Sequence, residues 1–122
     1  MKKIAILLSI VFFMMMFSCK KNQLNGKSVI QGSVKHHSKV IPNAKVYIKF
    51  KAKEFPGRDF SVYDAMVTAD SLGVYSIKCY KGDYYLFGTG YDSQISENVF
   101  GGTPVHIRNN ETVDIDIAVT ED

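Results

Sequence analysis

From residue 28 onward the chain alternates apolar and polar residues with a period of two, and this pattern constrains its fold more than any other feature. Successive side chains of a β-strand point to opposite faces, so such alternation predicts strands that bury one face. Strands are expected at 30–34, 44–51, 60–68, 75–79, 84–88, 105–107 and 113–119, with turn residues between them. Because 122 residues suffice for one domain, we predict an all-β antiparallel sandwich of seven short strands.

The first 19 residues have the pattern of a lipoprotein export signal. Two lysines precede an apolar run over residues 4–17, which is shorter than the roughly 20 residues that span a bilayer. The next segment, 16–19 (Met-Phe-Ser-Cys), resembles a bacterial lipobox, whose cysteine is acylated and becomes the first residue of the mature chain. We therefore predict a signal peptide over 1–18 and lipidation of Cys19, which would attach the protein to a lipid bilayer. An ordinary secretory signal and an uncleaved anchor are the alternatives.

Removal of this signal would leave a nearly neutral chain. The full chain has 15 basic and 12 acidic residues, and the signal takes two lysines, so 13 basic and 12 acidic residues remain, a net charge of +1. Nucleic-acid binding needs a concentrated basic field, so we expect no nucleic-acid partner. Residues 19–27 are interpreted as the lipidated cysteine and a polar, solvated tether, with contact between its lysines and anionic headgroups as the alternative. No acidic run follows Cys19, which favours an outer membrane location facing the periplasm.

Four segments carry short motifs in order along the chain: 30–34 (IQGSV), 40–46 (VIPNAKV), 68–77 (TADSLGVYSI) and 82–86 (GDYYL). Together they resemble carboxypeptidase regulatory-like domains over residues 28–119. The resemblance implies a transthyretin-like (prealbumin-like) seven-stranded Greek-key sandwich, with 120–122 as a tail, and a non-catalytic role in the bacterial cell envelope. Asn43 stands where the family usually has Gly, and Asn also tolerates left-handed backbone.

The residues offer no catalytic or metal-binding pattern. The transthyretin-like fold includes a hydroxyisourate hydrolase that ends in Tyr-Arg-Gly-Ser, whereas residues 119–122 are Val-Thr-Glu-Asp, so we do not expect an enzyme or a cofactor. Cys79 falls in the apolar register of its strand and is predicted to be a buried thiol. His36 and His37 are expected to be exposed loop residues without a metal, because no Cys or carboxylate lies beside them at ligand spacing.

Two segments are expected to be functional loops, 52–59 and 92–103. The residues that we predict to contact an envelope protein partner are Phe55, Arg58, Val99 and Phe100. The alternative is that the aromatic rings cap the open ends of the sandwich.

Other surface patterns leave alternatives open. A lysine stripe at positions 45, 49, 51 and 53 is interpreted as protection against edge pairing, with an anionic-ligand face as the alternative. Asp114 and Asp116 are expected to face outward and to pair with Lys45 or Lys49. The segment 70–72 resembles a Bacteroidetes O-glycosylation acceptor, which makes Ser71 a candidate modification site, although a turn alone explains the same residues. Outward tyrosines at 47, 80, 85 and 91 allow glycan stacking.

These observations predict a membrane-anchored envelope lipoprotein with a non-catalytic β-sandwich module for protein–protein interaction or structural support. Contact is expected through a loop end or through β-augmentation of an exposed strand edge. A glycan-binding accessory lipoprotein is the first alternative, and a transthyretin-like hydrolase is the second.

Overall fold

The computed structural model describes residues 20–122, so the expected signal peptide and Cys19 lie outside the described residues. This range contains no α-helix and one short 3₁₀ helix, η1, over Phe60–Val62. The strands are β1 (Leu24–His36), β2 (Lys39–Val40), β3 (Lys45–Phe50), β4 (Ala65–Thr68), β5 (Val74–Cys79), β6 (Gly82–Asp92), β7 (Glu97–Ile107), β8 (Thr112–Asp114) and β9 (Ile117–Ala118). The expected all-β class is confirmed.

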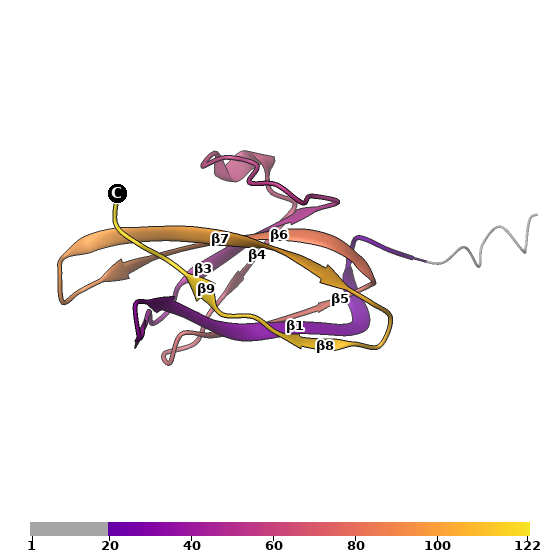
Figure 1. The fold of residues 1–122 in the computed structure, drawn as a ribbon, viewed down its shortest axis with the longest axis horizontal. Helices are drawn as coiled ribbons and strands as arrows, with labels where there is room; N and C mark the ends of the chain where they lie inside the picture. Colours follow the sequence, from indigo (N-terminus) through magenta and orange to yellow (C-terminus); the bar gives the residue numbers. More distant parts are fainter. Residues whose placement is uncertain (1–19) are drawn as a thin grey trace, which may run out of the picture.

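The strands form two sheets that lie face to face (Figure 1). One sheet is centred on β1, which pairs with β2 and β5 in antiparallel fashion and with β8 and β9 in parallel fashion. The other sheet has the order β4-β3-β6-β7 and is antiparallel throughout. Because β3 lies between β4 and β6, the lysine stripe of β3 does not protect a sheet edge, and that interpretation is wrong.

The hydrophobic core fills the space between the sheets, where alternate residues of each strand meet. Its fully buried members include Ile30, Val34, Val46, Ile48, Tyr84, Leu86, Ile107 and Ile117. Cys79 is buried among them, as the alternation predicted. The hydroxyl of Tyr84 donates to the carbonyl of Tyr80 at 2.7 Å, so this buried ring keeps its polar atom satisfied.

The segment that contains β8 and β9 joins the two sheets along one side of the sandwich. It first pairs with β1, and then Thr120 forms an antiparallel bridge with Phe100 of β7. Two glycines permit this crossing, because a Cβ at Gly32 would collide with the carbonyl of Ile115 and one at Gly101 with the carbonyl of Ala118. In Figure 1 the segment runs between β1 and β7.

This segment is not the continuous strand that its alternation predicted, because it breaks at residues 115–116. At the break the carboxylate of Asp116 accepts the backbone N–H of Ser33 at 2.9 Å, in place of a ladder carbonyl. Asp116 also lies 3.4 Å from Nζ of Lys35, and Asp114 accepts from Gln31. The expected pairing of these acids with Lys45 or Lys49 is therefore wrong.

The folded domain begins earlier than residue 28. Strand β1 starts at Leu24, and the backbone N–H of Asn22 already donates to the carbonyl of Lys81 at 2.8 Å. The side-chain oxygen of Asn22 accepts the N–H of Asp83 at 3.0 Å. Residues 22–27 thus belong to the domain and do not form a solvated tether.

The expected loop over 92–103 is instead the turn and the first part of β7 in a long hairpin, in which β6 and β7 pair from Gly82↔Ile107 to Asp92↔Glu97. Only the short turn 93–96 lies outside the two strands. The predicted strands 84–88 and 105–107 cover only parts of β6 and β7, because Gly90 and Gly101 interrupt the apolar alternation between them.

Candidate functional site

An aromatic cover lies on the outer face of the β4-β3-β6-β7 sheet. The segment 51–64 folds back over this face and places its rings on those of the strands (Figure 1). Phe60 stacks on Tyr47 with ring centroids 4.3 Å apart, and Phe55 lies 5.2 Å from Phe87. Phe87 is 2 % exposed because these rings cover it. We use the name aromatic cover for the five rings of Tyr47, Phe55, Phe60, Tyr63 and Phe87.

Three of the four predicted contact residues come together at this cover. Phe55 is 49 % exposed, and Arg58 places its guanidinium 4.9 Å from the ring centroid of Phe100. Nη2 of Arg58 also lies 2.6 Å from Oδ1 of Asp122, and this pairing raises the pKa of Arg58. The rings lie on a sheet face and do not cap the ends of the sandwich, so that alternative is wrong, whereas contact of Phe55, Arg58 and Phe100 with a partner stays a prediction.

Val99 is not a surface residue. It lies in β7 and is fully buried in the core, so its prediction as a contact residue is wrong. The error follows from the hairpin, which turns residue 99 inward where a loop was expected. Ser71, in contrast, is exposed in the turn before β5. The carboxylate of Asp70 closes that turn by accepting the N–H of Leu72 at 2.8 Å.

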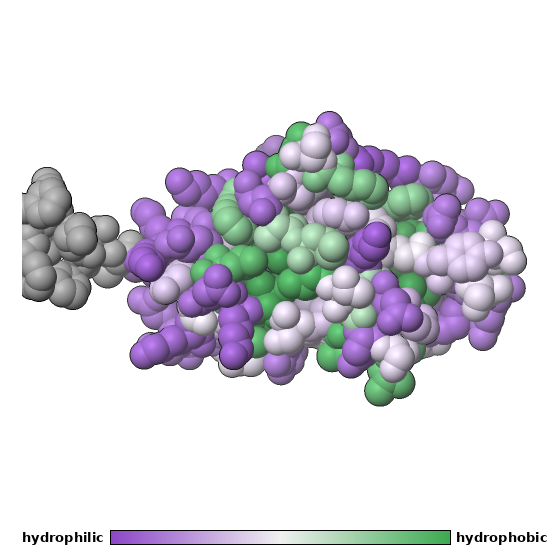
Figure 2. Space-filling view, turned by 180° about the vertical axis from the view of Figure 1, so that it is seen from behind, coloured by the Kyte–Doolittle hydropathy of each residue, from purple (hydrophilic) through white to green (hydrophobic). Residues whose placement is uncertain are grey.

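The side of the sandwich opposite β9 is open. Within residues 20–122, β4 pairs only with β3, and β5 pairs only with β1, so both strands present a free edge. Met66 and Val74, which are 46 % and 44 % exposed, point outward from these two edge strands, and the inward residues Ala65 and Val67 of β4 are only half-buried. Figure 2 shows apolar surface gathered over this region. We call β4 and β5 with these four side chains the open edge.

A buried polar cluster lies at the far end of the hairpin. Asp92 is 2 % exposed, its Oδ2 is 2.8 Å from Nδ1 of His36, and Nζ of Lys39 donates to its other oxygen. Lys39 and then His36 lower the pKa of Asp92 to about 2. Glu121 places a carboxylate oxygen 2.7 Å from Nε2 of His36.

The expectation that His36 is an exposed loop residue is therefore wrong. Its side chain continues the inward register of Ile30 and Val34, a spacing of two that the sequence already contained. The turn itself comes one residue later, at His37, where φ is 57°.

Burial shifts the pKa of two further groups, one in the core and one in the aromatic cover. Burial raises the pKa of the Cys79 thiol, and burial also raises the pKa of Tyr63 to about 12. Within the described residues, no three His, Cys, Asp or Glu side chains lie together as a metal site would require. The side chains that gather in residues 20–122 thus form an aromatic cover, an apolar open edge and a polar structural cluster.

Comparison with family models and with curated proteins found no match to this chain. Among the residues that the structure describes, there is also no helix with the length and hydropathy of a membrane span.

Proposed function

We propose that this chain is a lipoprotein of the bacterial cell envelope, anchored through acylated Cys19, whose β-sandwich binds another protein through the open edge. The observation that carries the binding role is the free apolar edge of β4 and β5, which exposes Met66 and Val74 and half-exposes Ala65 and Val67. Free strand edges offer unpaired backbone groups, and natural proteins usually guard them with charge. Strand β4 carries no charged residue and β5 carries one, Lys78, so the edge of β4 in particular suits strand addition by a partner.

The finer fold assignment belongs to the same proposal. Setting aside the two-residue β2, and treating β8 and β9 as one strand interrupted at 115–116, leaves seven strands. Such a set suits the Greek-key sandwich of carboxypeptidase regulatory-like domains. Asn43 supports the resemblance, since its φ of 57° is the backbone conformation for which the family uses Gly. Ser71 is proposed as an O-glycosylation site, and an outer membrane location facing the periplasm is proposed for the anchor.

Site-specific photo-crosslinking in the native host tests the binding role. A photoreactive residue at position 66 or 74 is expected to capture the same envelope protein. The matched control at Lys45 is exposed on the outer face of the same sheet and should capture nothing comparable. Met66→Lys should remove the crosslink from position 74, because a charge on the edge opposes strand addition. Capture from Phe55 or Arg58 alone would move the contact to the aromatic cover and contradict the use of the open edge.

A glycan-binding role is the second candidate, and one groove favours it. Phe60 and Tyr91, which are 45 % and 53 % exposed, line this groove together with the amides of Asn43 and Asn98. Rings beside amides can stack on and hydrogen-bond to a sugar. A saturable change of tyrosine fluorescence with an oligosaccharide, lost in Tyr91→Ala and kept in Tyr80→Ala, is the expected result. No saturation with any oligosaccharide would exclude this role.

A further inference from the structure

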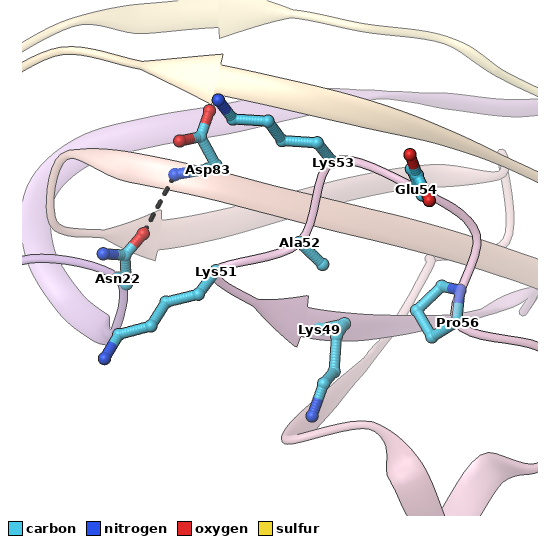
Figure 3. Close-up of a pocket in the computed structure, with 8 residues that line it drawn as sticks. All are labelled: Asn22, Lys49, Lys51, Ala52, Lys53, Glu54, Pro56 and Asp83. Atoms are coloured by element: carbon cyan, nitrogen blue, oxygen red, sulfur yellow. Dashed lines mark hydrogen bonds between the residues drawn. The ribbon is translucent and has the colours of Figure 1, made fainter.

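Residue 20 enters the domain at one end of the sandwich (Figure 1), and basic side chains line the hollows at this end. Three hollows adjoin at this end: the first and second share Asn22 and Asp83, and the second and third share Asn109. We call this the basic end. Lys49 also lines the first hollow, but it pairs with Asp64, and this pair adds no net charge. The other cationic residues of the basic end are Lys20, Lys21, Lys27, Lys51, Lys53, Lys81 and Arg108. Figure 3 shows the hollow beside Lys51 and Lys53, with Asn22 and Asp83 at its rim.

The charge of this end differs in sign from the rest of the domain. Its seven bases face three acids, Glu54, Asp83 and Glu111, which gives a net charge of +4. The remaining six bases and nine acids of residues 20–122 give −3. The sequence is nearly neutral, yet the folded domain concentrates positive charge at one end. The net charge of the sequence could not predict this uneven distribution.

The bases of this end are also free. Within the described part of the chain, none of the seven forms a salt bridge, and all but Lys81 are exposed. The other bases of the described residues are mostly paired: Lys35 with Asp116, Lys39 with Asp92, Lys49 with Asp64 and Arg58 with Asp122. The free cationic groups are thus concentrated at one end, where a ligand with many negative charges can meet them.

The chain between this end and Cys19 is short. Asn22 is fixed to the domain by its backbone N–H, which donates to Lys81, and by its side chain, which accepts from Asp83. Only Lys20 and Lys21 separate it from Cys19. Three fully extended residue steps span at most about 11 Å. An anchor at Cys19 would hold the basic end within about one Debye length of the bilayer surface, which is roughly 8–10 Å in physiological salt.

We propose that the basic end rests on anionic phospholipid headgroups of the bilayer that holds Cys19. This inference depends on the anchoring proposed above and adds an orientation to it. The long axis of the sandwich then stands away from the membrane. The open edge runs up its side, and the buried Asp92 cluster lies at the distal end. Each basic residue held at an anionic surface strengthens attachment about fivefold, so removing two should weaken docking on the order of 25-fold.

The test uses the acylated chain reconstituted in vesicles. A donor fluorophore is placed on a cysteine introduced at Ser93, in the exposed turn at the distal end, and an acceptor is placed on the headgroups. We expect weak energy transfer on vesicles with about 30 % phosphatidylglycerol in phosphatidylcholine, where docking holds this turn away from the bilayer, and stronger transfer on phosphatidylcholine alone or in about 0.5 M NaCl, where the domain tilts freely. At this salt concentration the Debye length falls to about 4 Å, so the basic side chains no longer interact with the charged bilayer surface.

The matched variants separate docking from general charge. Lys51→Gln with Lys81→Gln should lower the docked-to-undocked ratio on the order of 25-fold. Lys35→Gln with Lys45→Gln removes the same charge elsewhere and should leave the ratio unchanged. Equal transfer on both lipid compositions, or an equal loss in both double variants, would overturn the docking. Mass spectrometry of the N-terminal peptide is measured first, because an unmodified Cys19 would contradict the anchoring. An acylated Cys19 with energy transfer that does not depend on lipid charge would contradict only the docking.

Discussion

Nδ1 of His36 lies 2.8 Å from Oδ2 of Asp92, and both side chains are buried where the β6–β7 hairpin meets the turn after β1. This polar contact joins the two sheets, whereas most of the core joins them through apolar packing. Lys39 completes the pairing from β2. The far end of the sandwich therefore depends on an ionised carboxylate.

The dependence predicts a loss of stability in acid. The pKa of Asp92 is about 2 in the folded state, below the value of about 3.9 for an unfolded Asp, so the ionised form favours the fold. This contribution is present above about pH 4 and is lost as the pH falls toward 2. The urea midpoint should drop over that window. The variant Asp92→Asn should have a lower urea midpoint than the wild type at pH 7, and its midpoint should fall less between pH 4 and 2. The variant Ser93→Ala should follow the wild type at each pH. An unchanged acid profile in Asp92→Asn would contradict the pairing.

Gly32 is expected to be sensitive to the smallest substitution. A Cβ at this position collides with the carbonyl of Ile115, so Gly32→Ala must push the β8–β9 segment away from β1. We expect a loss of about 3 kcal/mol in the free energy of unfolding, at the upper end of single substitutions. Ser33→Ala, the next residue on the same strand, should change it by less than about 0.5 kcal/mol. Equal stability of the two variants, measured by urea unfolding, would show that the crossing is not tight.

Phe87 is expected to hold the segment 51–64 on the sheet. Its ring is almost fully buried under Phe55, Phe60 and Tyr63, so Phe87→Ala should cost about 3 kcal/mol. Limited proteolysis should then cut within 51–64 earlier than in the wild type. Tyr91→Ala removes an exposed ring from the same strand and should leave the cleavage pattern unchanged. Early cleavage at some other segment would argue against this role of the cover.

Cys79 is expected to be inert toward thiol reagents. The thiolate is the reactive form, and burial both shields the sulfur and raises the pKa of the thiol. In Cys19→Ala, where Cys79 is the only thiol, Ellman's reagent should detect no thiol in the native protein and one after unfolding in urea. Rapid native labelling would mean that β5 opens readily from the core.

Much of the fold could be predicted because most strands bury one face only. The alternation located β1, β3 and β5 and the inward positions of Tyr84 and Cys79 correctly. It located residues 84–88 of β6, although a second layer also covers their outer face, but it did not predict the rest of that strand. The alternation also failed to predict most of β7. Gly101 interrupts it there, because a Cβ at this position would collide with the carbonyl of Ala118, a contact that exists only in the folded chain.

The candidate site was less predictable for a related reason. Phe55, Arg58 and Phe100 were recognised as unusual, yet their meeting on one sheet face depends on how the segment 51–64 folds back. The open edge could not be recognised at all, since an edge strand is defined by which neighbour it lacks. Val99 was misplaced by the single error of taking a hairpin for a loop.

The segment that contains β8 and β9 also determines when the domain can fold during synthesis. Strand β1 is among the first parts of the domain to be synthesised, yet its partners β8 and β9 lie more than 80 residues later in the chain. Contacts of such long sequence separation form slowly and only after both partners are available. The sandwich therefore cannot close before residues 112–120 have emerged from the ribosome. Until then the chain stays open, which is the state in which a polypeptide can be threaded through a translocation pore.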